Sequence, residues 1–487
     1  MEIRIKKGLD INLPGAAHKE VASTPCVSEY AVQPTDYVGI VPKLLVTEGD
    51  VVSAGDPLFY DKRLPQVMFS SPVDGVVKAV VRGEKRKLLA VVVASEEKEA
   101  TELSSHEECR GYDGTESQLR EAMCHNGLWT VIRQRPFGLV ANPDETPKAI
   151  FVSACESYPL APEAKFVLKG REQDFAIGLQ TLSRLTPGKV HLSVREERQE
   201  QDADKNEGTQ EVPSRFFDSL ADGKIQVHTV SGPHPSGNVG VQIARINPIN
   251  KGELVWTVQL QDVAVIGHWV RTGVYHPIKR VALAGPDVRM PRYYDMIAGA
   301  QLRPILEQQL KHKEGERIVS GDVLSGTSVG IDGYLGARDT LVTVIPEGDY
   351  YDFMGWLMPG IKKYSFSHTF LSGFTANTGL GRCITRLSNL AGVTWVGRMV
   401  NDFEFNTNMH GSVRPLVVTG QFEKVFPFDI YPMQLIKACI IKDIELMEDL
   451  GIYEVEPEDF ALCEFIDTSK TEIQAVVREA LEYIRNN

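Results

Sequence analysis

Cysteine is scarce in this chain of 487 residues, and its seven cysteines are scattered. No two of them have the spacing of a CxxC motif. An odd number without close pairs argues against a disulfide framework, a zinc ribbon and a standard iron–sulfur binding run. We therefore expect reduced and mostly buried thiols at Cys26, Cys109, Cys124, Cys155, Cys383, Cys439 and Cys463.

Long apolar runs and an excess of positive charge are also absent. No stretch approaches the roughly 20 consecutive apolar residues that a membrane-spanning helix needs. The first residues, MEIRIKKGLDINLPG, lack the apolar core of a secretory signal. The formal net charge of -13 argues against a nucleic-acid binder, which would need a basic field to meet phosphates. We expect a protein of the cytoplasm, or of the cytoplasmic side of a membrane.

Patterns that indicate catalysis or metal binding are missing as well. The 11 histidines show neither HxH nor HExxH spacing, and no GxSxG elbow occurs. The sequence therefore indicates no catalytic residue and no metal ligand.

The chain does contain enough apolar residues to form several folded units. Its length suggests about three or four domains, and 43% hydrophobic residues is ordinary for a globular protein. Residues 28–94 alternate short apolar runs with the turns EGD, AGD, VDG and RGE, which predicts an antiparallel all-β unit. The phrases KLLVTEGDVVSAGDPL (43–58) and FSSPVDGVV (69–77) look like the two halves of a lipoyl- or biotinyl-type barrel.

A carrier of that type needs a lysine at the tip of a tight hairpin between the halves. Asp61-Lys62-Arg63 offers one, but Pro65 follows where the returning strand should begin. Proline cannot donate to the strand ladder, so we expect a remodelled hairpin and an unmodified Lys62. A lipoyl- or biotinyl-type carrier that uses Lys62 remains an alternative.

The middle of the chain has an α/β pattern. A helix is expected at 116–127, strands at 148–155, 189–194 and 224–230, and a helical stripe at 163–185, with a solvated insertion at 195–214. Strand–helix–strand order implies a parallel, Rossmann-like sheet. Residues 253–310 predict a small α+β module, and three helical segments follow residue 431. We expect domains at 1–100, 101–252, 253–310, 311–430 and 431–487.

Two stretches could bind a ligand. The glycine-rich loop GPHPSGNVG (232–240) follows a strand, but it fits neither GxGxxG nor a P-loop, and its prolines remove N–H donors. In HNGLWTVIRQRPFG (125–138), the aromatic residues and guanidinium groups of Trp129, Arg133, Arg135 and Phe137 could stack on a flat ring such as a quinone or flavin. These four are the candidate quinone-binding residues. Core aromatics with surface arginines are the alternative.

The chain also resembles one family along its whole length: the A subunits of the bacterial Na+-translocating NADH:quinone oxidoreductases (Na+-NQR). The segments that carry the resemblance are IKKGLDINLPG (5–15), SPVDGVV, GLWTVIRQRPFG, KAIFVSACESYPLAP, VSGPHPSGNVG, LVWTVQLQDVAVIG, VSGDVLSG (319–326), VFPFDIYPMQLIKACIIKD and EDFALCEFI.

The resemblance implies a peripheral component of a six-subunit complex on the cytoplasmic side of the inner membrane. That complex passes electrons from NADH to a quinone such as ubiquinone and drives Na+ outward. Flavins and iron–sulfur centres would belong to the partner subunits, quinone binding in part to this one, and no group would be covalently bound here. The isolated chain would not be catalytic.

The fold implied is that of the flavin subunit of respiratory complex I and of the Rnf C subunit. With the N-terminal barrel-sandwich hybrid, we expect a multidomain α+β protein. Those relatives combine a Rossmann-like domain, an SLBB-type β-grasp module, which would be residues 253–310 here, and a C-terminal helical domain. That last domain holds a cluster in the relatives, but here it has only Cys439 and Cys463, too few thiolates for a four-cysteine cluster. A flavin-binding NADH dehydrogenase subunit, with 232–240 holding the phosphate, is the other alternative.

Overall fold

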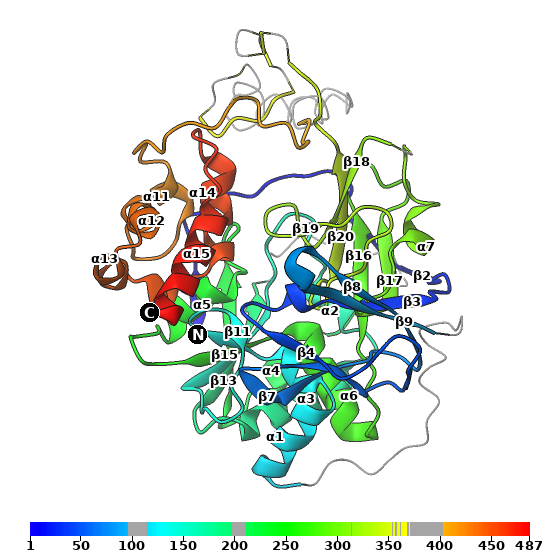
Figure 1. The fold of residues 1–487 in the computed structure, drawn as a ribbon. Helices are drawn as coiled ribbons and strands as arrows, with labels where there is room; N and C mark the ends of the chain where they lie inside the picture. Colours follow the sequence, from blue (N-terminus) through cyan, green and yellow to red (C-terminus); the bar gives the residue numbers. More distant parts are fainter. Residues whose placement is uncertain are drawn as a thin grey trace.

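A computed structural model describes residues 1–95, 114–196, 211–213, 215–312, 314–352, 354–355, 358–360, 362–367, 370 and 403–487. Four β-sheets organise these residues, and a group of helices at the C-terminal end flanks them (Figure 1). Most of the expected linker after Ala94 and of the insertion after Val194 lies outside the described residues, as do Cys109 and Cys383.

The N-terminal barrel is built from two small sheets. One has the order β3-β9-β8-β5 and the other β4-β6-β7. Their bounds are β3 Glu29–Val32, β4 Pro42–Leu44, β5 Val51–Val52, β6 Pro57–Asp61, β7 Leu64–Ser70, β8 Gly75–Arg82 and β9 Leu88–Ala94.

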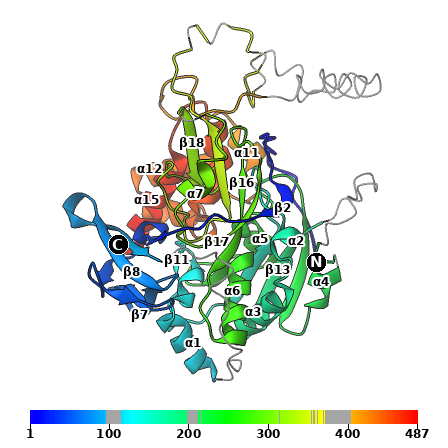
Figure 2. The same ribbon diagram turned by 90° about the vertical axis from the view of Figure 1, so that its right-hand side faces the viewer.

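Two turns of this barrel are stabilised in the same way, by an aspartate that accepts from a backbone N–H three residues earlier. The Asp50 carboxylate accepts from the N–H of Thr47, and the Asp56 carboxylate accepts from the N–H of Ser53, both at 2.7 Å. Gly49 and Gly55 each have a φ of 94°, a conformation that favours glycine. In Figure 2 the strands β7 and β8 lie to one side of the α/β unit.

The hairpin at Lys62 is tighter than we expected. Lys62 and Arg63 form a two-residue turn, and β7 already begins at Leu64. Pro65 is tolerated because β7 is the edge strand of its sheet and a register shift leaves Pro65 outside the paired positions. Leu64 therefore begins the returning strand ahead of Pro65, and an exposed Lys62 stands at the tip.

The first strands of the chain join the other two sheets rather than the barrel. β1 (Glu2–Arg4) pairs in parallel with β14 (Ile225–Ser231). β2 (His18–Ala22) pairs in parallel with β17 (Arg292–Ile297). Residues 1–22 therefore tie together units that lie far apart in the sequence.

The central α/β sheet is the predicted Rossmann-like unit, with the order β1-β14-β13-β12-β15-β10-β11. Apart from the strands already named, it contains β10 Arg133–Arg135, β11 Leu139–Val140, β12 Ala149–Ala154, β13 Lys189–Arg195 and β15 Val255–Gln259. Neighbours from β1 to β15 are parallel, whereas β10 and β11 add an antiparallel edge.

Helices cover both faces of this sheet. α3 (Glu172–Arg184) and α6 (Leu260–Thr272) pack against each other on the face of Ile150 and Val152, and α5 (Val239–Ile246) covers the opposite face at Phe151. The alternation follows from the two-residue period of β12. The other helices of the unit are α1 Glu116–His125, α2 Ala164–Val167 and α4 Arg215–Ser219.

The β-grasp sheet has the order β19-β18-β20-β16-β17-β2. Its new elements are β16 Ile278–Ala284, α7 Arg303–Leu306, β18 Glu316–Ser320, β19 Thr327–Ser328 and β20 Leu341–Pro346. We expected residues 253–310 to form this module. However, β15 pairs with β12 and α6 packs on α3, so the module begins at β16, and β18 to β20 extend it beyond residue 310.

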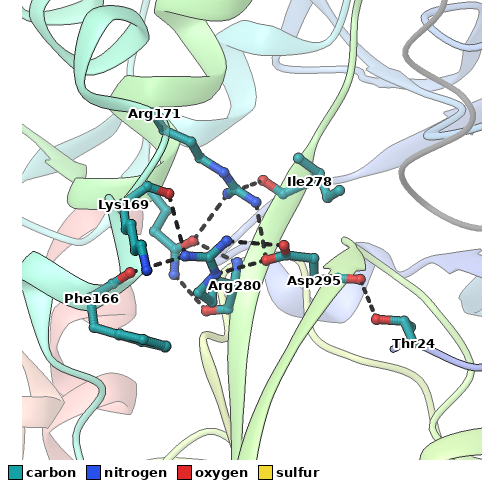
Figure 3. Close-up of polar contacts among 8 residues, drawn as sticks. Thr24, Phe166, Lys169, Arg171, Ile278, Arg280 and Asp295 are labelled. Carbon is teal, nitrogen blue, oxygen red and sulfur yellow. Dashed lines mark hydrogen bonds and ion pairs between the residues drawn. The ribbon is translucent and has the colours of Figure 1, made fainter. Parts of the chain in front are cut away.

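A partly buried carboxylate clamps the β-grasp sheet to the α/β unit (Figure 3). Asp295 on β17 accepts from Arg280 of β16 at 2.9 and 3.1 Å, and from Arg171 before α3 at 3.2 Å. Arg280 also donates to the carbonyl of Phe166 at 3.0 Å, and Thr24 of the N-terminal segment donates to the Asp295 carbonyl at 2.8 Å.

The C-terminal helices have their own core. They are α11 Phe422–Val425, α12 Pro432–Ile441, α13 Ile444–Asp449, α14 Ala461–Ile466 and α15 Ile473–Asn486. Cys439 and Cys463 are buried in this core as free thiols, and burial raises the pKa of Cys439 to about 12. The same core includes Ile3 and Val230, so the helices pack against the β1–β14 edge of the α/β sheet.

Candidate functional site

A cavity of about 640 Å³ opens where the units meet. Its floor is formed at the carboxyl ends of β12 and β15, with Ser153, Glu156 and Gln259 in the lining. β13 lies on one side of β12 and β15 on the other, so the strand order reverses at this point. Open α/β sheets bind ligands at such a switch point, and the volume is in the range of small-molecule sites.

The other walls come from three separate parts of the chain. The barrel contributes the 3-10 helix η1 (Pro34–Asp36), the β-grasp sheet contributes residues 320–341, and the C-terminal region contributes the 3-10 helix η6 (Pro457–Phe460) and α15. Several separate units of the chain therefore shape the cavity together.

Two of the four sequence-predicted quinone residues line this cavity. Arg133 and Arg135 both lie on β10, and residues two apart on a strand point to the same face. Arg133 is half-buried and donates through Nε to the carbonyl of Gly138 at 3.2 Å.

Arg135 is fully engaged with acidic groups of the C-terminal region. It is 3% exposed and pairs with Glu456 at 3.4 Å, with Asp459 at 3.3 Å and with Glu458. Burial alone would lower the pKa of Arg135, but Glu456 and Asp459 raise it. Burial raises the pKa of Asp459 to about 7, although Arg135 opposes the shift. This cluster joins β10 to η6 across the cavity.

The two predicted aromatic residues lie elsewhere. Trp129 is fully buried in the 3-10 helix η4 (Leu128–Val131), where its indole N–H donates to the Ala141 carbonyl at 2.7 Å and its ring packs edge-on against Trp256. Phe137 is half-buried and contacts the C-terminal helical core, with its ring 6.0 Å from that of Tyr453. Neither residue is part of the cavity lining.

The glycine-rich loop at 232–240 forms one rim of the cavity. His234, Gly237 and Asn238 line it, and α5 begins directly after Asn238. The loop is packed against its surroundings: the Asp10 carboxylate accepts from the N–H of His234 at 2.9 Å, and the Ser157 hydroxyl accepts from the N–H of Gly237 at 2.8 Å. It is a structured turn that places the α5 N-terminus at the cavity.

Acidic side chains make up much of the remaining wall. Burial raises the pKa of Asp36 and of Glu156 to about 7, and it raises the pKa of Asp322 and Asp339. Each accepts a hydrogen bond within the wall. Asp36 accepts from the N–H of Ala337 and Glu156 from the Tyr158 hydroxyl. Asp36 and Glu156 can therefore hold or release a proton near neutral pH.

Sequence reasoning missed two further arginines, Arg338 and Arg478. Arg338 lies in the loop before β20, and Arg478 lies on α15. Both line the cavity beside Arg133. In the sequence both look like ordinary surface positions, because nothing local signals that two distant segments meet at β10.

The described residues offer neither a metal centre nor a membrane span. No group of three or more His, Cys, Asp or Glu side chains among them could hold a metal ion. No helix in the described ranges is long and apolar enough to cross a membrane.

Known protein families divide the chain in the same way. Residues 3–96 match the model "NqrA N-terminal barrel-sandwich hybrid domain", residues 114–275 match "NqrA second alpha/beta domain", and residues 280–330 match the SLBB model "NQRA C-terminal domain". These matches confirm the predicted barrel-sandwich hybrid, α/β domain and SLBB module.

Whole-chain relatives agree. The chain is 34% identical to the A subunit of the Na(+)-translocating NADH-quinone reductase of Rhodopirellula baltica, over 99% of this chain and 97% of the relative. It is 36% identical to the corresponding protein of Histophilus somni and 34% identical to that of Haemophilus influenzae, with 99% of both chains covered in each case. A solved NAD+-reducing nickel–iron hydrogenase covers 77% of this chain and 69% of its own at 11% identity and a TM-score of 0.33, too weak a likeness to inform function. The predicted family is thus confirmed: the chain belongs to the NqrA family, the A subunits of the Na+-translocating NADH-quinone reductases.

Proposed function

We propose that this chain is a peripheral component of a six-subunit Na+-pumping NADH:quinone oxidoreductase on the cytoplasmic side of the bacterial inner membrane. It contributes to assembly of the complex and to quinone binding. The flavins and iron–sulfur centres are carried by its partners. The observation that supports this role is the likeness to NqrA relatives over 99% of the chain, which includes every unit that borders the cavity.

Assembly can be tested in a strain that lacks this chain. Membranes are isolated with and without the restored gene, and Na+-dependent NADH:quinone reductase activity is measured together with co-purification of the partner subunits. We expect the activity and the co-purification to return together. Full activity in membranes without the chain would contradict the proposal.

Quinone binding is a separate part of the proposal. Arg133 and Arg135 support it because both reach the cavity, where guanidinium groups could hydrogen-bond to a quinone carbonyl. Trp129 and Phe137, the other two predicted quinone residues, flank these arginines in the sequence. A photoreactive quinone is expected to label peptides that border the cavity, and labelling confined to other segments would exclude this site.

A carrier role is kept as a second candidate for one reason. The hairpin holds Lys62 exposed at the tip of a two-residue turn, as a carrier lysine would be. The intact mass of protein from its native host decides the matter, since a lipoyl or biotinyl addition on Lys62 would favour the carrier. The flavin-binding alternative has a separate test, which is titration of the chain with flavin mononucleotide.

A further inference from the structure

Three arginines converge on one cavity without a carboxylate partner. Arg133 comes from the α/β sheet, Arg338 from the β-grasp unit and Arg478 from the C-terminal helix α15. Within the described residues, no carboxylate oxygen lies within 4.0 Å of any of the three guanidinium groups. Three separate units therefore deliver positive charge to the same place.

Most N–H donors of these arginines are unused within the described part of the chain. Arg133 donates only through Nε, to Gly138, and Arg478 donates only through Nη1, to the Phe137 carbonyl at 2.8 Å. Arg338 makes no hydrogen bond there, and its Nη1 atom is buried without an acceptor. A buried donor without an acceptor is costly, and an arginine that is kept in this state calls for an explanation.

The arginines also repel one another. Burial and then the neighbouring Arg133 lower the pKa of Arg338 to about 10. Burial lowers the pKa of Arg478, and Arg133 again adds to the shift, although Glu456 opposes it. In the protein alone, the fold therefore keeps the three arginines near one another despite the repulsion between their positive charges.

Carboxylates line the cavity as well, but within the described residues none of them pairs with the cluster. The pKa of Glu458 depends on all of these arginines. Burial alone would raise this pKa, but Arg135, Arg133 and Arg338 lower it. The Glu458 carboxylate, however, accepts its hydrogen bond from Arg135. Glu456 and Asp459 also pair with Arg135, and Asp262 pairs with Lys279 at 2.7 Å.

The N-terminus of α5 adds to the positive potential. Gly237, Asn238 and Val239 line the cavity, and α5 has eight residues, so its first turn presents a partial positive charge there. Asn238 does not cap the helix, because its side-chain amide donates to the Glu458 carbonyl at 3.2 Å.

We infer that the cavity is a binding site for a phosphate-bearing small molecule, held by Arg133, Arg338 and Arg478. A phosphate group has three free acceptor oxygens and up to two negative charges, so it can accept hydrogen bonds from more than one guanidinium group. A carboxylate offers only two oxygens. Ser320, Asp322 and Asp339, which also line the cavity, suit a ligand body that carries hydroxyl groups. This inference goes beyond the proposed function and does not depend on it, because it concerns the isolated chain.

The test is calorimetric titration of the purified full-length chain with inorganic phosphate, adenosine 5′-monophosphate and adenosine. We expect the two phosphate compounds to bind saturably and adenosine not to bind. Arg338→Gln is expected to weaken binding by roughly 10- to 100-fold, the effect of losing hydrogen bonds to a charged group. Arg82→Gln, at an exposed barrel turn outside the cavity, is the matched control and should bind like the wild type.

Stability separates a ligand-binding arginine from a structural one. Because Arg338 has no partner in the described part of the protein alone, Arg338→Gln should not lower the melting temperature of the ligand-free chain. Arg133→Gln gives an independent second measurement of affinity. The inference is overturned by absence of saturable phosphate binding, by unchanged affinity in both variants, or by a marked loss of stability in Arg338→Gln.

Discussion

The Asp295 clamp gives a prediction that tests how the units are held together. The side chain of Asp295 is 18% exposed, and its partners Arg280 and Arg171 are 10% and 16% exposed. Asp295→Ala removes the carboxylate that both guanidinium groups bind. Breaking a buried pair from one side costs about 3–5 kcal/mol, because an uncompensated charge remains. Asp295→Asn keeps the shape and an acceptor, so its cost is about 1–2 kcal/mol.

The assay is urea unfolding followed by tryptophan fluorescence. Trp129, Trp256 and Trp269 all lie in the α/β unit that the clamp holds, so their emission reports on its transition. The midpoint and slope together give the change in unfolding free energy. The matched control is Glu307→Ala. It removes a carboxylate from an ion pair in which both side chains are exposed, and its cost should stay below about 1 kcal/mol.

A double-mutant cycle makes the test sharper. If Arg171 and Asp295 act together, the double variant Asp295→Ala/Arg171→Ala should lose less than the sum of the single losses. A loss below about 1 kcal/mol for Asp295→Ala alone would mean that water, rather than this carboxylate, balances the two arginines. The clamp would then have no part in holding the β-grasp sheet in place.

Three further predictions concern helix packing, an aromatic core residue and a titrating wall residue. Gly267→Ala should cost about 1–3 kcal/mol in urea unfolding, because an added Cβ would lie 1.7 Å from the Asp174 carbonyl oxygen where α3 and α6 meet; no measurable loss would show that the helices can separate freely. Trp129→Ala should cost about 3–5 kcal/mol as a fully buried side chain, whereas an exposed ligand-stacking ring would leave stability nearly unchanged. Burial raises the pKa of Glu156 from 4.5 to about 7, so the stability from its bound proton is complete below about pH 4.5 and is lost as the pH rises toward 7. Thermal melts between about pH 5 and 8 should therefore show a smaller fall for Glu156→Gln than for the wild type, and parallel curves would contradict the assignment.

The parts of the fold that could be predicted are those that follow from local sequence patterns. The turns around Gly49 and Gly55 predicted the barrel, and the helix that begins at Glu116 ends before Gly127 as expected. The parallel sheet followed from strand–helix–strand order. Each of these features depends on residues that are close together in the chain.

What could not be predicted depends on contacts between distant segments. β15 looked like the first strand of the β-grasp module, because its sequence does not say that β12 is its neighbour. Trp129 and Arg133 are close in sequence, yet only Arg133 reaches the cavity, because the 3-10 helix η4 turns the indole into the core before β10 begins. Arg338 and Arg478 meet Arg133 only through the folded arrangement of three units.

The strand pairing of residues 1–22 sets an order for folding during synthesis. The first strand leaves the ribosome early, but its partner β14 ends only at Ser231, and the partner of the second strand ends only at Ile297. The barrel between them can form from its own neighbouring strands long before that. The amino-terminal segment therefore stays unpaired until β14 and then β17 have been made, by which time the neighbouring strands of the barrel can already have paired.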